Sequence, residues 1–234
     1  MPDLSRLTRR LRGATQRLIF DLRFGSFTGG LHKTQFAQEG ACDTVSTDLR
    51  LLPALLDPVI KEGDVFVDIG CGRGRVLNWV IDQGRAKLVF GIELDKRIAS
   101  KVAARLAPLR SVTVIAGDAL VSLPDAVTVM YLWNPFDQNV MQAFRDIVIA
   151  KYRRLETLGN LRIIYHNALH IDAWEECSDC TISEIEMPAW VGQRAVLIQF
   201  SAGPSCPPSA VFEETPVSCS GPLDAAEALP RSDS

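Results

Sequence analysis

The sequence has few of the features that mark membrane, secreted or nucleic-acid-binding proteins. No apolar stretch reaches the ~18 residues that a transmembrane helix needs. The first six residues lack the apolar core of a signal peptide. A net charge of −3 gives the chain no general basic field that would attract nucleic acid. We therefore expect a cytoplasmic protein with no strong nucleic-acid signal.

Cysteine and histidine are scarce, with six cysteines and three histidines in 234 residues. Six cysteines do not make a dense disulfide framework in a chain of this length, so we expect reduced thiols. One group does combine residue types that bind zinc, namely His166, His170, Cys177 and Cys180. Its spacing is short of a standard zinc finger, and His166 directly follows a predicted strand. We attribute this spacing to chance and predict no metal.

A glycine-rich turn stands out from this background. The apolar run over residues 65–69 contains Asp68, glycine then recurs at positions 70, 72 and 74, and a helix is predicted from Arg75. Glycine lacks a Cβ, so the backbone can bend sharply and approach a ligand closely. The following helix directs its free N–H groups at that ligand. The pattern predicts a nucleotide-like cofactor at the carboxyl end of a strand in an α/β sheet.

The spacing of the glycines restricts the kind of cofactor. A dinucleotide-binding turn needs its third glycine at position 75, where this chain has arginine. No segment fits the phosphate-binding P-loop pattern. The carboxylate of Asp68 would repel a pyrophosphate but would suit a ligand that carries an amine. A glycine turn without any ligand is the alternative.

The turn, D-x-G-x-G-x-G, resembles motif I of the class I S-adenosylmethionine-dependent methyltransferases. The resemblance implies S-adenosyl-L-methionine as cofactor and S-adenosyl-L-homocysteine as product. It places the turn beside the amino-acid part of the cofactor, with these residues as candidates: Asp68, Gly70, Cys71, Gly72 and Gly74. We expect Cys71 to be a small packing residue rather than a nucleophile.

A second apolar run, over residues 88–92, ends in Glu93. A carboxylate at the end of the second strand can accept hydrogen bonds from both hydroxyls of a ribose. In the resembled family this is the usual partner of the cofactor ribose. Asp95 competes for the role, and either acid could instead cap the predicted helix over residues 96–106. We assign Glu93 to the ribose and Asp95 to the cap.

A third apolar run, over residues 112–116, leads into Gly117, Asp118 and Ala119. By resemblance this is the adenine-binding step of the family. Asp118 would accept a hydrogen bond from the adenine amino group, and the backbone N–H of Ala119 would serve a ring nitrogen. An isolated triplet of this kind is a common turn, so its value lies in its place after the third strand.

The fourth run, over residues 127–133, ends in Asn134, Pro135 and Phe136. This resembles the [DN]-P-P-[FYW] motif of family members that methylate amino groups, with one proline fewer. The resemblance implies that Asn134 and a following carbonyl hold the target nitrogen, while the ring of Phe136 stabilises the developing cation. These three residues are the catalytic candidates. A plain turn, with Phe136 in the core, is the alternative.

The resemblance covers about residues 40–200 and implies an α/β fold. We expect a Rossmann-like, doubly wound, seven-stranded and mostly parallel sheet with helices on both faces, and the alternation of apolar runs with helical stretches agrees. The last three strands are predicted over residues 161–165, 181–187 and 194–200, the final two as an antiparallel pair. The loop over residues 188–193 would lie at the rim of the substrate site.

Both ends differ from the domain over residues 41–200. Residues 1–40 form a basic amphipathic helix and joint in our interpretation, with a local charge of +5 over residues 1–33. This segment could cover the cofactor site, contact an acidic partner or membrane surface weakly, or be a surface helix; we favour a surface helix that also covers the site. Residues 201–234 hold five acids and one arginine among Pro and Ser, which predicts a disordered acidic tail.

These observations together predict a methyltransferase. Because of Asn134, we expect methylation of nitrogen in an amine or amide, on a protein side chain or a small molecule. Two alternatives stay open. One is transfer to oxygen or carbon of a small molecule, and the other is a non-catalytic protein that binds S-adenosylmethionine as a scaffold.

Overall fold

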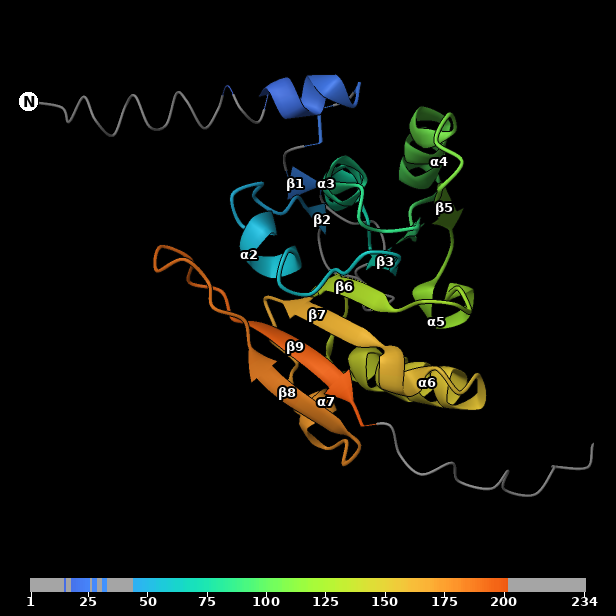
Figure 1. Cartoon of the computed structure of the whole chain (residues 1–234), viewed down its shortest axis with the longest axis vertical. Helices are drawn as coiled ribbons and strands as arrows, with labels where there is room; N and C mark the ends of the chain where they lie inside the picture. Colours follow the sequence, from blue (N-terminus) through green and yellow to red (C-terminus); the bar gives the residue numbers. More distant parts are fainter. Residues whose placement is uncertain (1–14, 16–17, 26, 29–30, 33–43, 202–234) are drawn as a thin grey trace, which may run out of the picture. The chain divides into compact units, whose positions relative to one another are not determined.

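The structure of the chain, a computed structural model, describes residues 15, 18–25, 27–28, 31–32 and 44–201 (Figure 1). These residues all fall within one compact unit, Met1–Gly203. The part of the predicted basic amphipathic helix before residue 15, most of the joint and the acidic tail from residue 202 lie outside the described residues. The same holds for Cys42, Cys206 and Cys219.

Seven strands form one sheet in the order β5-β4-β3-β6-β7-β9-β8. Strands β3 to β7 run parallel to their neighbours, while β9 is antiparallel to both β7 and β8. The bounds of the sheet strands are β3 Val65–Ile69, β4 Leu88–Glu93, β5 Val112–Ala116, β6 Val129–Trp133, β7 Arg162–His166, β8 Cys180–Glu184 and β9 Ala195–Phe200. The predicted Rossmann-like sheet is confirmed.

Helices of different lengths and one pair of short strands complete the described part of the chain (Figure 1). Two short strands, β1 Leu31–His32 and β2 Thr44–Val45, pair antiparallel. The helical segments are α2 Leu52–Leu56, α3 Arg75–Gln83, α4 Lys96–Leu106, α5 Ala119–Ser122, α6 Gln138–Arg154, the 3-10 turn η2 Leu158–Asn160, and α7 Asp172–Glu175. Residues 18–23 are also helical.

Alternate residues of the central strands contribute to two separate hydrophobic clusters. In β3, Val67 and Ile69 join a cluster that contains Met141 and Phe144 of α6. Phe66, which points the other way, joins a cluster with residues of α2, α3 and α4. Both faces of the sheet are therefore covered by helices. This explains why the central strands are continuous apolar runs rather than alternating ones.

The register of the parallel strands brings the predicted site residues to one edge of the sheet. Ile69, the last residue of β3, pairs with Ile92 on β4 and with Leu132 on β6. The residues that follow these positions leave the sheet at the same carboxyl edge. Since the chain changes direction across the sheet between β3 and β6, this is the switch point where α/β proteins bind ligands.

The bounds of β7, β8 and β9 differ from the predicted ones, by a single residue at the start of β9. His166 is the last residue of β7, paired with Trp133 of β6, rather than a residue just after the strand. Strand β8 begins at Cys180 and ends at Glu184, whereas the sequence predicted residues 181–187. Its ladder stops there because its partner β9 begins only at Ala195. In the part of the chain that the structure describes, no helix has the length and apolar character to span a bilayer.

Candidate cofactor and acceptor site

The turn after β3 needs glycine at three positions. Gly70, Gly72 and Gly74 have φ values of 75°, 50° and 79°, which is the left-handed region that residues with a Cβ rarely enter. The backbone N–H groups of Gly70 and Cys71 both donate to the carbonyl of Ile92, each at 2.9 Å. Gly74 is the N-cap of α3. The turn is therefore fixed against β4 and leads directly into the helix, as the sequence predicts.

Asp68 is a buried carboxyl at the end of β3, with 3% of its surface exposed. Among the described residues, no hydrogen bond or ion pair to its side chain is found. Burial, with a further contribution from the negative charge of Glu93, raises the pKa of Asp68 to about 8. A buried acid with a strongly shifted pKa at the carboxyl edge of an α/β sheet is a typical sign of a functional site.

Glu93 joins the glycine turn to the end of β4. Its Oε2 accepts a hydrogen bond from the N–H of Gly72 at 2.8 Å, and its Oε1 accepts one from the N–H of Asp95 at 2.9 Å. Burial raises the pKa of Glu93, and these backbone N–H groups partly offset the effect. A carboxylate has about four acceptor positions. The backbone N–H group of Leu94 also stabilises the ionised carboxylate, and the remaining acceptor capacity of Glu93 can serve ribose hydroxyls.

The two aspartates that follow the ends of β4 and β5, Asp95 and Asp118, both cap helices. Asp95 accepts hydrogen bonds from the N–H groups of Arg97 and Ile98, which confirms it as the N-cap of α4. Asp118 accepts one from the N–H of Leu120 and caps α5 through its Oδ1. Asp118 is exposed, whereas the next residue, Ala119, is buried. Asp118 keeps its second carboxylate oxygen for a ligand.

Asn134 follows β6 in an unusual backbone conformation. Its φ is 38°, one of three positive values among the described residues other than glycine, and 8% of its surface is exposed. Its Oδ1 accepts a hydrogen bond from the hydroxyl of Tyr165 at 2.7 Å. That hydroxyl in turn accepts one from the N–H of His170 at 3.2 Å. Outliers of this kind cluster at functional sites, where surrounding contacts fix them.

Pro135 brings the end of β6 against the glycine turn. A Cβ built on Gly70 would lie 3.4 Å from the Cβ of Pro135. The two segments are 65 residues apart in sequence, so the fold joins the predicted cofactor turn and the predicted acceptor motif in one place. The sequence could not show this contact.

Phe136 is a core residue. Only 9% of its surface is exposed, and its ring packs against that of Phe144 at a centroid distance of 5.1 Å. This placement agrees with the alternative interpretation of Phe136 as ordinary core. The ring belongs to the hydrophobic cluster that contains Met141 and Phe144 of α6.

A second group at the carboxyl edge was not among the sequence-based candidates. Trp133 and His166 end neighbouring strands, and their rings stack with centroids 5.1 Å apart. The hydroxyl of Tyr131 lies 3.0 Å from Nδ1 of His166 and 2.8 Å from Oγ1 of Thr47. Trp133 ends β6 and His166 ends β7, and this position at the carboxyl ends of neighbouring strands is the signal that could have identified them.

His166 is fully buried and electrically neutral at physiological pH. Burial lowers the pKa of His166 to about 4, and the neighbouring Gln193 side chain offsets only a small part of this effect. Its Nε2 has no hydrogen-bond partner among the described residues. The stacked ring pair therefore forms a polar but uncharged wall next to Asn134.

The three cysteines that the structure describes are free thiols with no evident chemistry. Cys71 is buried in the turn, and burial raises the pKa of its thiol well above the usual value. Cys177 and Cys180 are free thiols, and Cys180 donates to the carbonyls of Trp174 and Cys177. Among the described residues, no three His, Cys, Asp or Glu side chains are grouped as a metal site would require.

Comparison with known proteins supports the fold. No protein-family model matches the chain, and no curated protein sequence matches it. One similar solved structure is a Streptococcus pneumoniae protein provisionally described as a tRNA (m1A22) methyltransferase. It is 15% identical, has a TM-score of 0.51, and the match covers 68% of this chain and 71% of that one.

A second solved structure is an RNA methyltransferase from Salinibacter ruber in complex with S-adenosyl-L-homocysteine. It is 17% identical, has a TM-score of 0.50, and the match covers 70% of this chain and 98% of that one. At such identities a likeness carries the fold and not the substrate. The chain has the fold of the class I S-adenosylmethionine-dependent methyltransferases.

Proposed function

We propose that this protein is an S-adenosylmethionine-dependent methyltransferase whose acceptor atom is a nitrogen of an amine or amide. The observation that carries the proposal is the buried carboxyl of Asp68 at the glycine turn, with no partner among the described residues. A ligand ammonium is the natural partner for such a group, because it would compensate the cost of burying the ionised acid. The amino-acid part of S-adenosylmethionine supplies an ammonium.

The remaining residues of the site fit the same cofactor. Glu93 has acceptor positions left for two ribose hydroxyls, and Asp118 has one carboxylate oxygen left for the adenine amino group. A Cβ at Gly70 would lie in ordinary van der Waals contact with Pro135, and the positive φ of Gly70 disfavours a larger residue in the turn. A dinucleotide is disfavoured, since Arg75 stands where its third glycine would be and Asp68 would repel a pyrophosphate.

The bound cofactor supplies a sulfonium methyl group that is already reactive. The protein therefore has to provide proximity, alignment and exclusion of water. Asn134 is the residue that aligns the acceptor in this proposal. The Tyr165 hydroxyl donates to its Oδ1 and so fixes the orientation of the amide, which would align the acceptor nitrogen with the methyl group. The partly buried Trp133 ring and the buried His166 ring help to exclude water from this side.

Other acceptors are the competing outcomes. Transfer to oxygen or carbon would use Asn134, Pro135 and Phe136 as a wall only. RNA is a further acceptor class to include, since both solved structures above carry RNA or tRNA methyltransferase in their descriptions. The chain's net charge of −3 gives no separate support for RNA. A protein that binds the cofactor without turnover is the remaining outcome.

A thermal-shift series tests the cofactor. We expect S-adenosylmethionine and S-adenosylhomocysteine to raise the melting temperature, and NAD and ATP to leave it unchanged. A ligand at one hundred times its Kd adds about 2.7 kcal/mol to the free energy of unfolding. In a domain of this size that is a rise of roughly 5–10 °C. The proposal would be contradicted if only NAD or ATP raised the melting temperature, or if none of the four ligands raised it.

Replacement of Asn134 by alanine tests the acceptor role. We expect Asn134→Ala to keep the wild-type Kd for S-adenosylhomocysteine and to lower turnover with amine acceptors at least roughly tenfold, since one aligning hydrogen bond is lost. The measurement is S-adenosylhomocysteine release with a panel of amines, peptides, phenols and total tRNA. Unchanged turnover with phenols or tRNA would assign the acceptor to those classes and reject nitrogen alignment by Asn134.

A further inference from the structure

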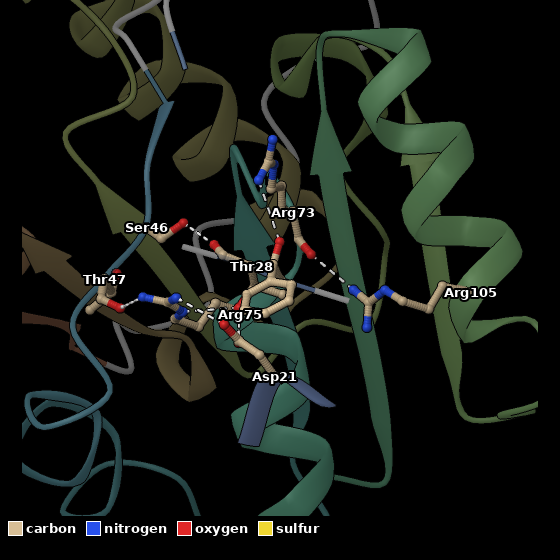
Figure 2. A network of polar contacts seen from close by, with 8 residues as sticks. Asp21, Thr28, Ser46, Thr47, Arg73, Arg75 and Arg105 are labelled. Atoms are coloured by element: carbon tan, nitrogen blue, oxygen red, sulfur yellow. Dashed lines mark hydrogen bonds and ion pairs between the residues drawn. The ribbon is translucent and has the colours of Figure 1, made fainter. Parts of the chain in front are cut away.

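Three arginines attach residues 21–28 to the glycine turn (Figure 2). Arg73 lies within the turn, Arg75 is the first residue of α3, and Arg105 comes from α4. Each of them contacts a residue between Asp21 and Thr28. The sequence left open whether this N-terminal segment covers the cofactor site, binds a partner or is a plain surface helix. The contacts favour the first role.

Arg75 lies at the centre of the contacts in Figure 2. Its Nε donates to Oγ1 of Thr28 at 3.0 Å, and its Nη1 donates to the carbonyl of Thr47 at 3.2 Å. Its Nη2 lies 3.5 Å from Oδ2 of Asp21. The hydroxyl of Thr28 also donates to Oδ1 of Asp21 at 2.5 Å. One guanidinium thus joins three separate segments of the chain.

This cluster is buried, which makes it costly to break. The exposed surface is 8% for Arg75, 4% for Asp21 and 0% for Thr28. A buried ion pair is tolerated when hydrogen bonds satisfy both partners, and the loss of one partner leaves a buried charge uncompensated. The planar fork of arginine matches this arrangement, and the single amine of lysine does not.

Arg73 and Arg105 hold the backbone around the same turn. Arg73 donates to the carbonyl of Phe27 at 3.4 Å. Arg105 donates from Nη1 to the carbonyl of Phe24 at 3.2 Å and from Nη2 to the carbonyl of Arg73 at 2.8 Å. A Cβ built on Gly74 would lie 3.0 Å from Nη2 of Arg105. The N-terminal segment and the turn therefore share their hydrogen bonds.

Thr47 extends the cluster toward the acceptor side. Its carbonyl accepts from Arg75, and its hydroxyl lies 2.8 Å from that of Tyr131, which contacts His166. Ser46 also donates a short hydrogen bond to the carbonyl of Thr28. The segment around residues 46–47 is therefore bound both to the N-terminal segment and to the strand ends where the acceptor would lie.

We propose that Arg75 is a positioning residue for the cofactor. Arg75 holds Asp21, Thr28 and Thr47 against the glycine turn. The N-terminal segment around Asp21 and Thr28 thereby contributes to cofactor binding. This inference rests on the proposed function. Arg75 acts through the turn and through Asp21 and Thr28, not by contact with the methyl group. Its side chain reaches these residues from the first turn of α3, so their contacts add to those that hold the turn against β4.

The test measures S-adenosylhomocysteine affinity by calorimetry, at a temperature where every variant is fully folded. Asp21→Asn keeps the shape of the side chain and removes the charge, and Arg75→Gln removes the fork. We expect each to raise the Kd roughly fivefold to tenfold, and Arg75→Lys to recover only part of the loss. Arg153→Gln is the matched control, because it breaks an exposed ion pair with Asp179. Asp179 directly precedes β8 at one edge of the sheet, whereas the glycine turn follows the central strand β3. We expect this variant to keep the wild-type Kd.

Hydrogen exchange gives a readout that a general loss of stability would not produce. In the wild-type protein, S-adenosylhomocysteine should slow exchange in peptides that cover residues 18–28, and in Asp21→Asn it should not. Wild-type protein that fails to bind the ligand would remove the proposed function itself. If the wild-type protein binds the ligand, and Asp21→Asn binds it equally well with the same protection, the positioning role of Arg75 is wrong. The proposed function would not be affected by that result.

Discussion

The Glu93→Ala variant should lose most of its affinity for S-adenosylhomocysteine. Two acceptor positions for the ribose disappear, and each hydrogen bond to a charged acceptor contributes about 1.5–3 kcal/mol. We therefore expect the Kd to rise roughly 100-fold or more. Isothermal calorimetry with S-adenosylhomocysteine measures the change directly, because this product does not react during the titration.

The same substitution should lower stability, for a separate reason. The N–H groups of Gly72 and Asp95 would both lose their acceptor at a position that is 7% exposed. An unsatisfied buried donor costs about 1–3 kcal/mol. We expect the free energy of unfolding, from urea denaturation, to fall by about 2–4 kcal/mol.

Two further variants separate the contributions of Glu93. Glu93→Gln keeps the size of the side chain but turns one acceptor into a donor that faces a backbone N–H. It should therefore lose affinity nearly as strongly as alanine. Glu184→Ala removes an exposed carboxylate on β8, at the opposite edge of the sheet from β4 and β5, and should bind normally. Normal affinity in Glu93→Ala that is still folded would reject the ribose assignment.

The fold could be predicted because the signals that define it are local. The continuous apolar runs that became β3, β6 and β7 mark strands buried on both faces, and Asp95 gave the start of α4 correctly. The end of β7 could not be predicted in this way, because histidine is not a strand-forming signal. His166 is held in the strand by its partner Trp133, which is a contact between distant segments.

The candidate site was predictable in its positions but not in its contacts. Residue types at strand ends indicated Asp68, Glu93 and Asn134. Nothing in the sequence indicated that Glu93 accepts from the glycine turn, or that Tyr165 holds the amide of Asn134. The cluster around Arg75 was missed for the same reason, since its members come from residues 21, 28, 47 and 75. Such contacts depend on the three-dimensional fold alone.

Cofactor affinity should depend strongly on pH through Asp68. With a pKa of about 8 in the free protein, this carboxyl is about 90% protonated at pH 7. A ligand ammonium favours the ionised form, so binding should release one proton. Linkage then makes affinity rise with pH, by up to about tenfold for each unit below pH 8. Between pH 6 and pH 8 we expect the Kd for S-adenosylhomocysteine to fall roughly 50-fold, because half of the carboxyl is still protonated at pH 8.

Stability in the absence of ligand should change in the opposite direction. The folded protein holds a proton on Asp68 that the unfolded chain, with an ordinary aspartate pKa of about 3.9, has already released. The stabilisation from this protonated form is complete below about pH 4 and is lost as pH rises toward 8. Glu93, whose pKa is also raised by burial, adds a contribution of the same sign.

Asparagine substitutions assign the pH dependence to one residue. Asp68→Asn cannot ionise, so its Kd should be weak and nearly flat from pH 6 to pH 8, and its stability at pH 8 should exceed that of the wild type. Asp95→Asn keeps a good helix cap and removes an acid whose pKa is lowered, so it should retain the wild-type slope. The thiol of Cys71 and the hydroxyl of Tyr131 stay protonated throughout, since burial raises the pKa of both.

A wild-type Kd that does not change with pH would mean that Asp68 stays protonated in the complex and donates a hydrogen bond. The carboxyl would then recognise a ligand oxygen, and the ammonium would have to bind elsewhere in the turn.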